Sequence, residues 1–337
     1  MSKVLRLHSF EGVSGLQIDE LPLVEPKGSE VRIQVEAFAL NWGDFELFDD
    51  EYTFTVELPA RNGDECVGVI DAIGPDVKNF KIGDRVGSLP WANPGYGVMG
   101  EFALVPELYV SRYPDNISIE EACSIWITYM TAYYPLVETS KVGPGDFVLL
   151  PAATSSAGIA AVNIVKKQGG KSIGTTRSAD NIDFLLNEVG CDYVIDTSKD
   201  SIGTKVLEIT DKKGCRVIYD PVGGPLMMDY ADAMGMQCQI FLYGSMTKSP
   251  TVLPEIKMAM ADAVLRSYTM YHHMWDPDEV ERGRKYVYDG IASGEFKAIV
   301  DRVYDDFTME NVLDALKYQE EGVGRRGKIV IRTEHEY

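Results

Sequence analysis

A change in hydrophobic pattern near residue 120 is the feature that most constrains the fold of this 337-residue chain. Before that point, polar and apolar residues alternate in Glu30–Leu40, and Cys66–Gly74 is rich in Val and Ile. Closely spaced turns of Gly, Pro, Asn and Asp separate such segments. This pattern is typical of short strands in a compact β domain, and no long helix is evident there.

After residue 120 the pattern indicates helices that alternate with strands. Residues 119–137 predict a helix, and four further helices are predicted at about 157–168, 179–188, 201–212 and 225–234. Short apolar strands, in which apolar residues are continuous rather than alternating, are predicted at 147–152, 172–177, 193–196, 216–220 and 239–244. Strands of this kind are buried on both faces, so the alternation predicts a doubly wound parallel sheet.

The last part of the chain is again helical and then returns to a strand. Asp276, with Glu279 three residues later, is typical of a helix N-terminus. A second helix is predicted at about 308–320, and the apolar strand Lys328–Arg332 follows it. We therefore predict two domains, of which the first is discontinuous: residues 1–121 with 265–337, and residues 122–264.

Charge and composition exclude several classes of function. With 32 basic and 52 acidic residues, the net charge of −20 would repel a phosphate backbone, so nucleic-acid binding is not expected. No apolar run is long enough for a membrane span, and the N-terminus lacks the apolar stretch of a signal peptide. The five cysteines include no CxxC pair, which favours buried thiols in a reducing compartment. We expect a cytoplasmic protein that does not bind membranes.

The segment Phe147–Lys167 carries the strongest chemical signal, because a buried strand, a turn of small residues and a helix follow one another. Small side chains let the backbone approach a pyrophosphate, whose charge is met by free N–H groups at the helix N-terminus. Only Gly158 remains of the usual three glycines, and Ala152 and Ser155 take the places of the first two. An ordinary strand-to-helix turn could use the same residues, but the alternating pattern downstream favours a dinucleotide site.

The end of the next predicted strand bears on the choice of nicotinamide cofactor. Gly174–Ser178 lacks the acidic residue that would accept both ribose hydroxyls of NAD. Arg177 can instead pair with a 2′-phosphate, and Ser178 can add a hydroxyl donor, so NADPH is predicted. Asp180 leaves NAD open, because it could bind the ribose if the strand ended later. A solvated surface arginine is the simpler alternative for Arg177.

Four segments, taken in order, resemble a known family. They are Asn62–Val86, Trp126–Tyr134, the AATSSAG turn and the DPVGG motif at Asp220–Gly224. With the returning C-terminal strand, they resemble the medium-chain dehydrogenase/reductases over nearly the whole chain, and most closely the zinc-independent quinone oxidoreductase (zeta-crystallin-like) branch. The resemblance implies a GroES-like β-barrel catalytic domain and a Rossmann domain, with nicotinamide and substrate in the cleft between them. It also implies a homodimer or homotetramer.

The chain departs from the zinc-dependent branch of that family at the metal-ligand positions. Where that branch has Cys, His and Cys, the matching residues are Asn41, Asp64 and Ile127. An amide, a carboxylate and an alkyl group cannot rebuild a thiolate and imidazole site. The four-cysteine structural lobe is missing as well, because residues 67–122 contain no cysteine. We therefore expect no zinc.

The resemblance implies NADPH-dependent hydride transfer to a quinone or an α,β-unsaturated carbonyl. Without zinc to polarise a carbonyl, such acceptors are favoured because they delocalise the incoming charge. Two alternatives stay open. An enoyl-thioester reductase shares the chemistry but would need a basic groove, which the net charge of −20 does not suggest. An NADPH-binding protein with negligible turnover, like related lens crystallins, is the other.

Asn41 and Tyr52 are the candidate catalytic residues, because they flank the loop that resembles the substrate and nicotinamide wall of this family. A neutral donor there would stabilise the charge that grows on the acceptor oxygen. Asp64 could orient either donor or cap a loop. The alternatives without a catalytic role are an amide that bonds the loop backbone for Asn41 and an aromatic side chain of the cleft or the surface for Tyr52.

Further cofactor contacts are implied by the resemblance. Thr131 would face the nicotinamide, although a helix threonine often bonds its own backbone instead. Gly244 ends a strand at the sheet edge where ligands bind, and Lys328 would lie beside the cofactor. The residues expected to line the pyrophosphate are Ala153, Ser155, Ser156 and Gly158.

Overall fold

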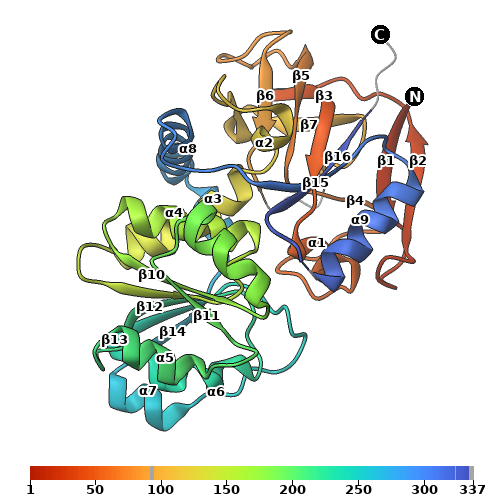
Figure 1. Cartoon of the computed structure of the whole chain (residues 1–337). Helices are drawn as coiled ribbons and strands as arrows, with labels where there is room; N and C mark the ends of the chain where they lie inside the picture. The colour runs from red at the N-terminus through yellow and green to blue at the C-terminus, as the bar shows by residue number, and fades with distance from the viewer. Residues whose placement is uncertain (92–94, 323, 334–337) are drawn as a thin grey trace. The chain divides into compact units, whose positions relative to one another are not determined.

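The computed structural model describes residues 1–91, 95–322 and 324–333, and the chain divides into two compact units (Figure 1). The second unit comprises Thr128–Met270 and Gly294–Lys297. The first comprises Met1–Ile127, Tyr271–Ser293 and Ala298–Tyr337, so it is assembled from three separate stretches of chain.

Two sheets form the first unit. The larger has seven strands, in the order β15-β16-β3-β5-β6-β8, with β7 paired to β3. Its strands are β3 (Glu30–Ala39), β5 (Cys66–Ile73), β6 (Arg85–Ser88), β7 (Phe102–Pro106), β8 (Val110–Ser111), β15 (Val300–Tyr304) and β16 (Lys328–Arg332). The smaller sheet has the order β2-β1-β4, from β1 (Ser2–Leu7), β2 (Leu16–Leu21) and β4 (Ala60–Arg61).

The strand β3 holds the larger sheet together. It pairs antiparallel with β5, β7 and β16, and apolar side chains such as Val31, Ile33 and Phe38 are buried in the core of this unit. Phe38 meets Phe307 edge to face, with ring centroids 5.3 Å apart. In β16, Val330 lies opposite Ala39, so the C-terminal strand lies beside β3 (Figure 1).

Helices complete the first unit. They are α1 (Trp42–Phe48), the 3₁₀ turn Glu107–Tyr109, α2 (Ile119–Ala122), α8 (Pro277–Ala292) and α9 (Met309–Glu321). Two further elements span the boundary between the units: α3 (Trp126–Tyr133) and the 3₁₀ segment Met270–Trp275.

The second unit contains a six-stranded sheet in which every pairing is parallel, in the order β11-β10-β9-β12-β13-β14. The strands are β9 (Phe147–Leu150), β10 (Lys171–Thr176), β11 (Tyr193–Asp196), β12 (Cys215–Asp220), β13 (Met234–Leu242) and β14 (Val264–Ser267). The chain runs outward from β9 in one direction and then outward from β12 in the other. The predicted doubly wound parallel sheet is therefore confirmed.

Helices cover both faces of this sheet, with α4 on one face and α5 and α7 on the other (Figure 1). The α-helices are α4 (Ser156–Lys167), α5 (Ile202–Ile209), α6 (Leu226–Asp229) and α7 (Glu255–Ala261). The tighter or wider turns are 3₁₀ at Ala179–Asn181 and Ala231–Ala233, and π at Tyr134–Thr139 and Phe184–Val189. No helix in the described ranges is long and apolar enough to cross a membrane.

The helix predicted at residues 119–137 is divided. Ser118 caps α2, and Glu121 returns the bond by accepting the Ser118 N–H at 2.7 Å. A new helix, α3, begins at Trp126, and a π-helical segment follows it from Tyr134 to Thr139. Pro135 lies in that segment and has no N–H to continue the α-helical bonding.

Candidate active site

The turn between β9 and α4 combines a left-handed residue with close backbone packing. Ala152 has φ +51°, a left-handed conformation that favours glycine. Gly158 has no room for a side chain, because a Cβ there would lie 2.8 Å from the Ala152 carbonyl oxygen and from Ala153 Cα. The Ser155 Oγ accepts the Gly158 N–H at 3.1 Å and caps α4, which begins at Ser156. As a result, the backbone at the N-terminus of α4 lies close to the backbone of the turn.

Arg177 follows β10 at the carboxyl end of the parallel sheet. Its side chain is exposed and forms no ion pair within the described ranges. The Ser178 hydroxyl is used locally: its Oγ accepts the Asp180 N–H at 3.3 Å and caps a 3₁₀ turn that contains Asp180. Arg177 is therefore a cation at this edge that is available to a ligand.

Two other residues predicted to contact the cofactor lie in the second unit. The Thr131 hydroxyl lies 3.2 Å from the Met270 sulfur. Gly244 follows β13, and a Cβ there would lie 2.7 Å from the Pro221 carbonyl oxygen. Close backbone packing thus explains the glycine at position 244.

A cavity in the first unit brings the predicted catalytic tyrosine together with two carboxyl groups. Tyr52, Asp44 and Asp64 all line it. The other lining residues are Gly43, Leu47, Phe54, Val56, Arg61, Gly63, Trp91, Tyr96 and Gly97. Its walls combine aromatic surface with a few polar groups.

A chain of hydrogen bonds links Tyr52 to Asp64. The Tyr52 and Tyr271 hydroxyl oxygens are 2.9 Å apart, and Tyr271 donates to Asp64 Oδ2 at 3.0 Å. The two tyrosine rings meet edge to face, with centroids 6.1 Å apart. Tyr271 was not predicted from the sequence, since it lies 219 positions from Tyr52 and carries no local signal.

Burial alters the protonation of the groups in this cavity. It raises the pKa of Asp64 to about 6, although the hydrogen bond from Tyr271 opposes the change. Burial, with the charge of Asp64, raises the pKa of Asp44 to about 8. The pKa values of Tyr52 and Tyr271 also lie well above the ordinary value because of burial, so both phenols stay protonated.

The raised pKa of Asp44 makes stability depend on pH. A carboxyl with a higher pKa in the folded than in the unfolded chain contributes stability that is complete below about pH 4 and is lost as pH rises through about 8. We expect Asp44→Asn, which keeps the amide oxygen as an acceptor, to gain a few kcal/mol of stability relative to wild type across that interval. Urea unfolding at a series of pH values measures this difference. The exposed Asp289→Asn is the control, and a difference between Asp44→Asn and wild type that stays flat with pH would contradict the prediction.

Lys328 is buried in the first unit and pairs with a residue that sequence reasoning missed. Its side chain is 1% exposed, and its Nζ lies 3.1 Å from Oε2 of Glu65, which is fully buried. Oε1 of Glu65 accepts the Trp126 N–H at 2.8 Å and the Ile127 N–H at 3.4 Å. Glu65 therefore fixes the start of α3 and neutralises the ammonium group of Lys328 at the same time.

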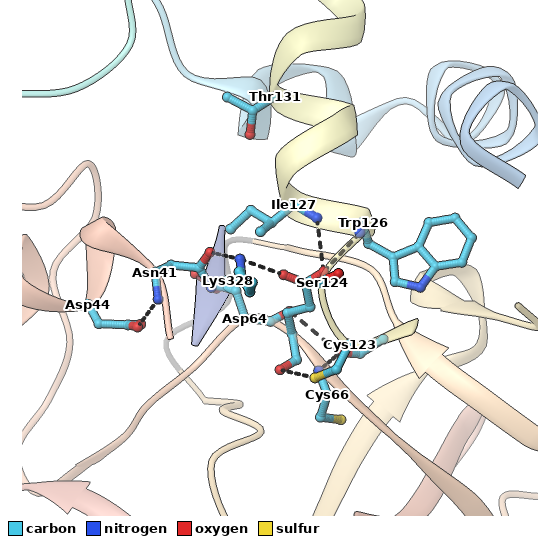
Figure 2. Close-up of polar contacts among 12 residues, drawn as sticks. Asn41, Asp44, Asp64, Cys66, Cys123, Ser124, Trp126, Ile127, Thr131 and Lys328 are labelled. Carbon is cyan, nitrogen blue, oxygen red and sulfur yellow. Dashed lines mark hydrogen bonds and ion pairs between the residues drawn. The ribbon is translucent and has the colours of Figure 1, made fainter. Parts of the chain in front are cut away.

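Asn41 completes this cluster. Its Oδ1 accepts a hydrogen bond from Lys328, as Figure 2 shows, and its backbone N–H donates to Asp44 at 2.7 Å. An ammonium can only donate, so the amide oxygen must face Lys328. The Asn41 Nδ2 is buried and has no partner in the described part of the chain. Asn41 thus keeps an unused donor.

The three positions that match zinc ligands do not form a metal site. Asn41 binds Lys328, Asp64 binds Tyr271, and Ile127 contributes its N–H to Glu65. Over residues 1–91, 95–322 and 324–333, no group of three His, Cys, Asp or Glu side chains could hold a metal ion.

Comparisons with known proteins match both units. Residues 27–115 match the alcohol dehydrogenase GroES-like domain, and residues 157–283 match the zinc-binding dehydrogenase domain. A quinone oxidoreductase of Pseudomonas aeruginosa is 31% identical over 66% of this chain and 67% of its own length. A 2-haloacrylate reductase of a Burkholderia species is 25% identical over 88% of this chain and 90% of its own length.

The fold matches solved structures as well. The quinone oxidoreductase of Escherichia coli, solved in complex with NADPH, has a TM-score of 0.87 and 23% identity. That match covers 98% of this chain and 99% of the solved one. The predicted combination of a GroES-like and a Rossmann domain is confirmed.

Proposed function

Because this chain belongs to the quinone oxidoreductase branch of the medium-chain dehydrogenase/reductase family, we propose that it transfers hydride from NADPH to a quinone or an α,β-unsaturated carbonyl. The observation that carries the proposal is the chain of hydrogen bonds that joins Tyr52 and Asp64, which line one cavity, through Tyr271. That chain can supply the proton that must accompany the hydride.

The residues of the second unit fit NADPH, which supplies the hydride when bound. The left-handed residue Ala152 and the close backbone packing at Gly158 lie at the N-terminus of α4, where a pyrophosphate would be bound by backbone N–H groups. Arg177 is exposed at the carboxyl edge of the sheet, where a guanidinium can hold a 2′-phosphate with two hydrogen bonds. The Escherichia coli relative was solved with NADPH, which supports the same choice. Thr131, Ser156 and Gly244 stay predicted contacts.

The preference for NADPH has a direct test in Arg177. We expect Arg177→Ala to weaken NADPH binding about 10- to 100-fold and NADH binding little, because a charge-assisted pair with the 2′-phosphate is lost. Fluorescence titration with each cofactor measures both affinities. Lys171→Ala, at the opposite end of β10, is the matched control and should change neither. Equal losses for the two cofactors in Arg177→Ala would refute the assignment.

On the acceptor side, Tyr52 donates a hydrogen bond to the oxygen on which negative charge grows. When Asp64 is ionised, Tyr271 donates to it and Tyr52 in turn donates to Tyr271, so the Tyr52 proton points away from the substrate. When Asp64 is protonated, the whole chain reverses and the Tyr52 hydroxyl is free to donate. The proton then moves from Asp64 to Tyr271, from Tyr271 to Tyr52, and from Tyr52 to the acceptor oxygen, and solvent reprotonates Asp64.

The acceptor class is tested by following NADPH oxidation with a panel of ortho-quinones, enones and enoyl thioesters. Turnover of quinones or simple enones supports the proposal. Turnover confined to enoyl thioesters would assign the chain to that alternative, and tight NADPH binding without turnover of any acceptor would indicate a binding protein.

A further inference from the structure

Arg61 lines the same cavity as Tyr52 and Asp64 but has no acidic partner in the described part of the chain. Its guanidinium Nη2 donates to the Phe102 carbonyl oxygen at 2.9 Å. Its Nε is buried and without a hydrogen-bond partner. Arginine has five N–H donors, so most of the binding capacity of this side chain is unused.

The position of Arg61 makes its charge costly. β4 pairs with β1 so that Arg6 lies directly opposite Arg61, and like charges in opposite positions destabilise a sheet. Arg6 is neutralised by Asp19 at 3.1 Å, whereas Arg61 is not neutralised. Burial, with a smaller contribution from Arg6, lowers the pKa of Arg61 to about 10, so the group is still charged at neutral pH.

The acidic residues around Arg61 are occupied by other groups. Glu30 lines an adjoining cavity with Arg61, but it accepts hydrogen bonds from the Tyr96 hydroxyl and from the Lys27 N–H at 2.8 Å. Within the shared cavity, Asp64 accepts from Tyr271, and Asp44 accepts from Asn41. Neither of these two carboxyls forms an ion pair with Arg61.

The backbone around Arg61 is held in place. A Cβ on Gly97 would lie 2.7 Å from the Arg61 Cβ and carbonyl carbon, so the chain at Gly97 packs directly against Arg61. The guanidinium itself is held by its hydrogen bond to the Phe102 carbonyl oxygen, and its planar fork suits a carboxylate.

We propose that Arg61 binds a carboxylate carried by the hydride acceptor, and that the enzyme therefore prefers acidic acceptors to neutral ones. This inference rests on the proposed function, because the molecule bound beside Tyr52 is taken to be the acceptor. The carboxylate would supply the negative charge that Arg61 lacks within the protein, at a distance along the acceptor from the carbonyl that Tyr52 binds.

The test compares two acceptors that share one enone: benzalacetone with a para-carboxylate, and the methyl ester of the same compound. We expect Arg61→Gln to lower kcat/KM for the acid about 10- to 100-fold, mainly through KM, and to change that of the ester little. Arg61→Lys keeps the charge and should show an intermediate loss. Arg6→Gln is the matched control on the opposite strand, outside the cavity, and should leave the ratio of acid to ester unchanged.

A second measurement does not depend on turnover. Calorimetry with the saturated acid, the product of enone reduction, should show binding that Arg61→Gln weakens and that high salt weakens in the wild type. Equal changes for acid and ester in Arg61→Gln, or binding of the saturated acid that Arg61→Gln leaves unchanged, would overturn the inference. Arg61-dependent binding of the acid with no reduction of either enone would support the anion site and refute the proposed function.

Discussion

Replacement of Tyr52 by phenylalanine is expected to lower kcat about 10- to 1000-fold while leaving NADPH affinity intact, since it removes one donor to the developing oxyanion. The ring remains to pack against Phe54 and Tyr271, so the cavity keeps its shape. Steady-state kinetics with the best quinone or enone, together with NADPH titration, measures the two quantities. Tyr288→Phe is the control, because Tyr288 is exposed and does not line the cavity.

The pH dependence identifies the proton source. Because the proposed relay requires protonated Asp64, wild-type kcat should fall as pH rises above about 6. Asp64→Asn cannot ionise and should remove that decline, and Tyr271→Phe should lower kcat because it breaks the link to Tyr52. Full activity in both Tyr52→Phe and Asn41→Ala would contradict the assignment of either residue as a donor, and proximity alone would then account for catalysis.

Glu65→Gln is expected to destabilise the protein by about 3–5 kcal/mol, because it leaves the Lys328 ammonium buried without a counter-charge. Lys328→Met should also destabilise the protein, since it leaves the buried Glu65 carboxyl without its counter-charge. The double variant removes both charges and should recover most of the loss. Urea unfolding measures all three, and Lys285→Ala, which removes an exposed ion pair with Asp289, is the control.

The same variants test the prediction that Lys328 contacts the cofactor. If Lys328 also bound NADPH, the double variant would regain stability but not NADPH affinity. If Lys328 interacts only with Glu65 and Asn41, the double variant would regain both stability and NADPH affinity. Additive losses in the double variant would show that Glu65 and Lys328 do not interact.

Most of the second unit could be predicted from the sequence, because each of its buried strands is marked by a short apolar run within its own segment. The apolar run at Tyr193–Asp196 is a strand with those same bounds, and four other predicted strands overlap observed ones. β14 was missed, because its residues are mostly exposed and give no apolar run. The break before α3 was also missed, since its partner Glu65 lies 61 positions from Trp126.

The candidate site was less predictable for the same reason. Tyr52 and Asn41 came from resemblance, whereas Tyr271, Glu65 and Arg61 depend on contacts that only the fold creates. Tyr271 is one of 18 tyrosines, and nothing in its neighbours distinguishes it. The proposed role of Arg61 depends on the absence of an acidic partner among the described residues around it, and no local sequence pattern indicates such an absence.

The pairing of β16 with β3 has a consequence for the order in which the protein is made. The ribosome must complete Lys328 before Glu65 and Asn41 can bind it, and Lys328 follows Asn41 by 287 positions. The sheet of the second unit, by contrast, comes from the uninterrupted stretch Thr128–Met270 and can form as soon as that stretch has emerged. Domains usually fold in the order of their synthesis. Here the first unit begins to be synthesised before the second but can be completed only after it. Until β16 is made, the larger sheet lacks that strand and Glu65 lacks its partner Lys328.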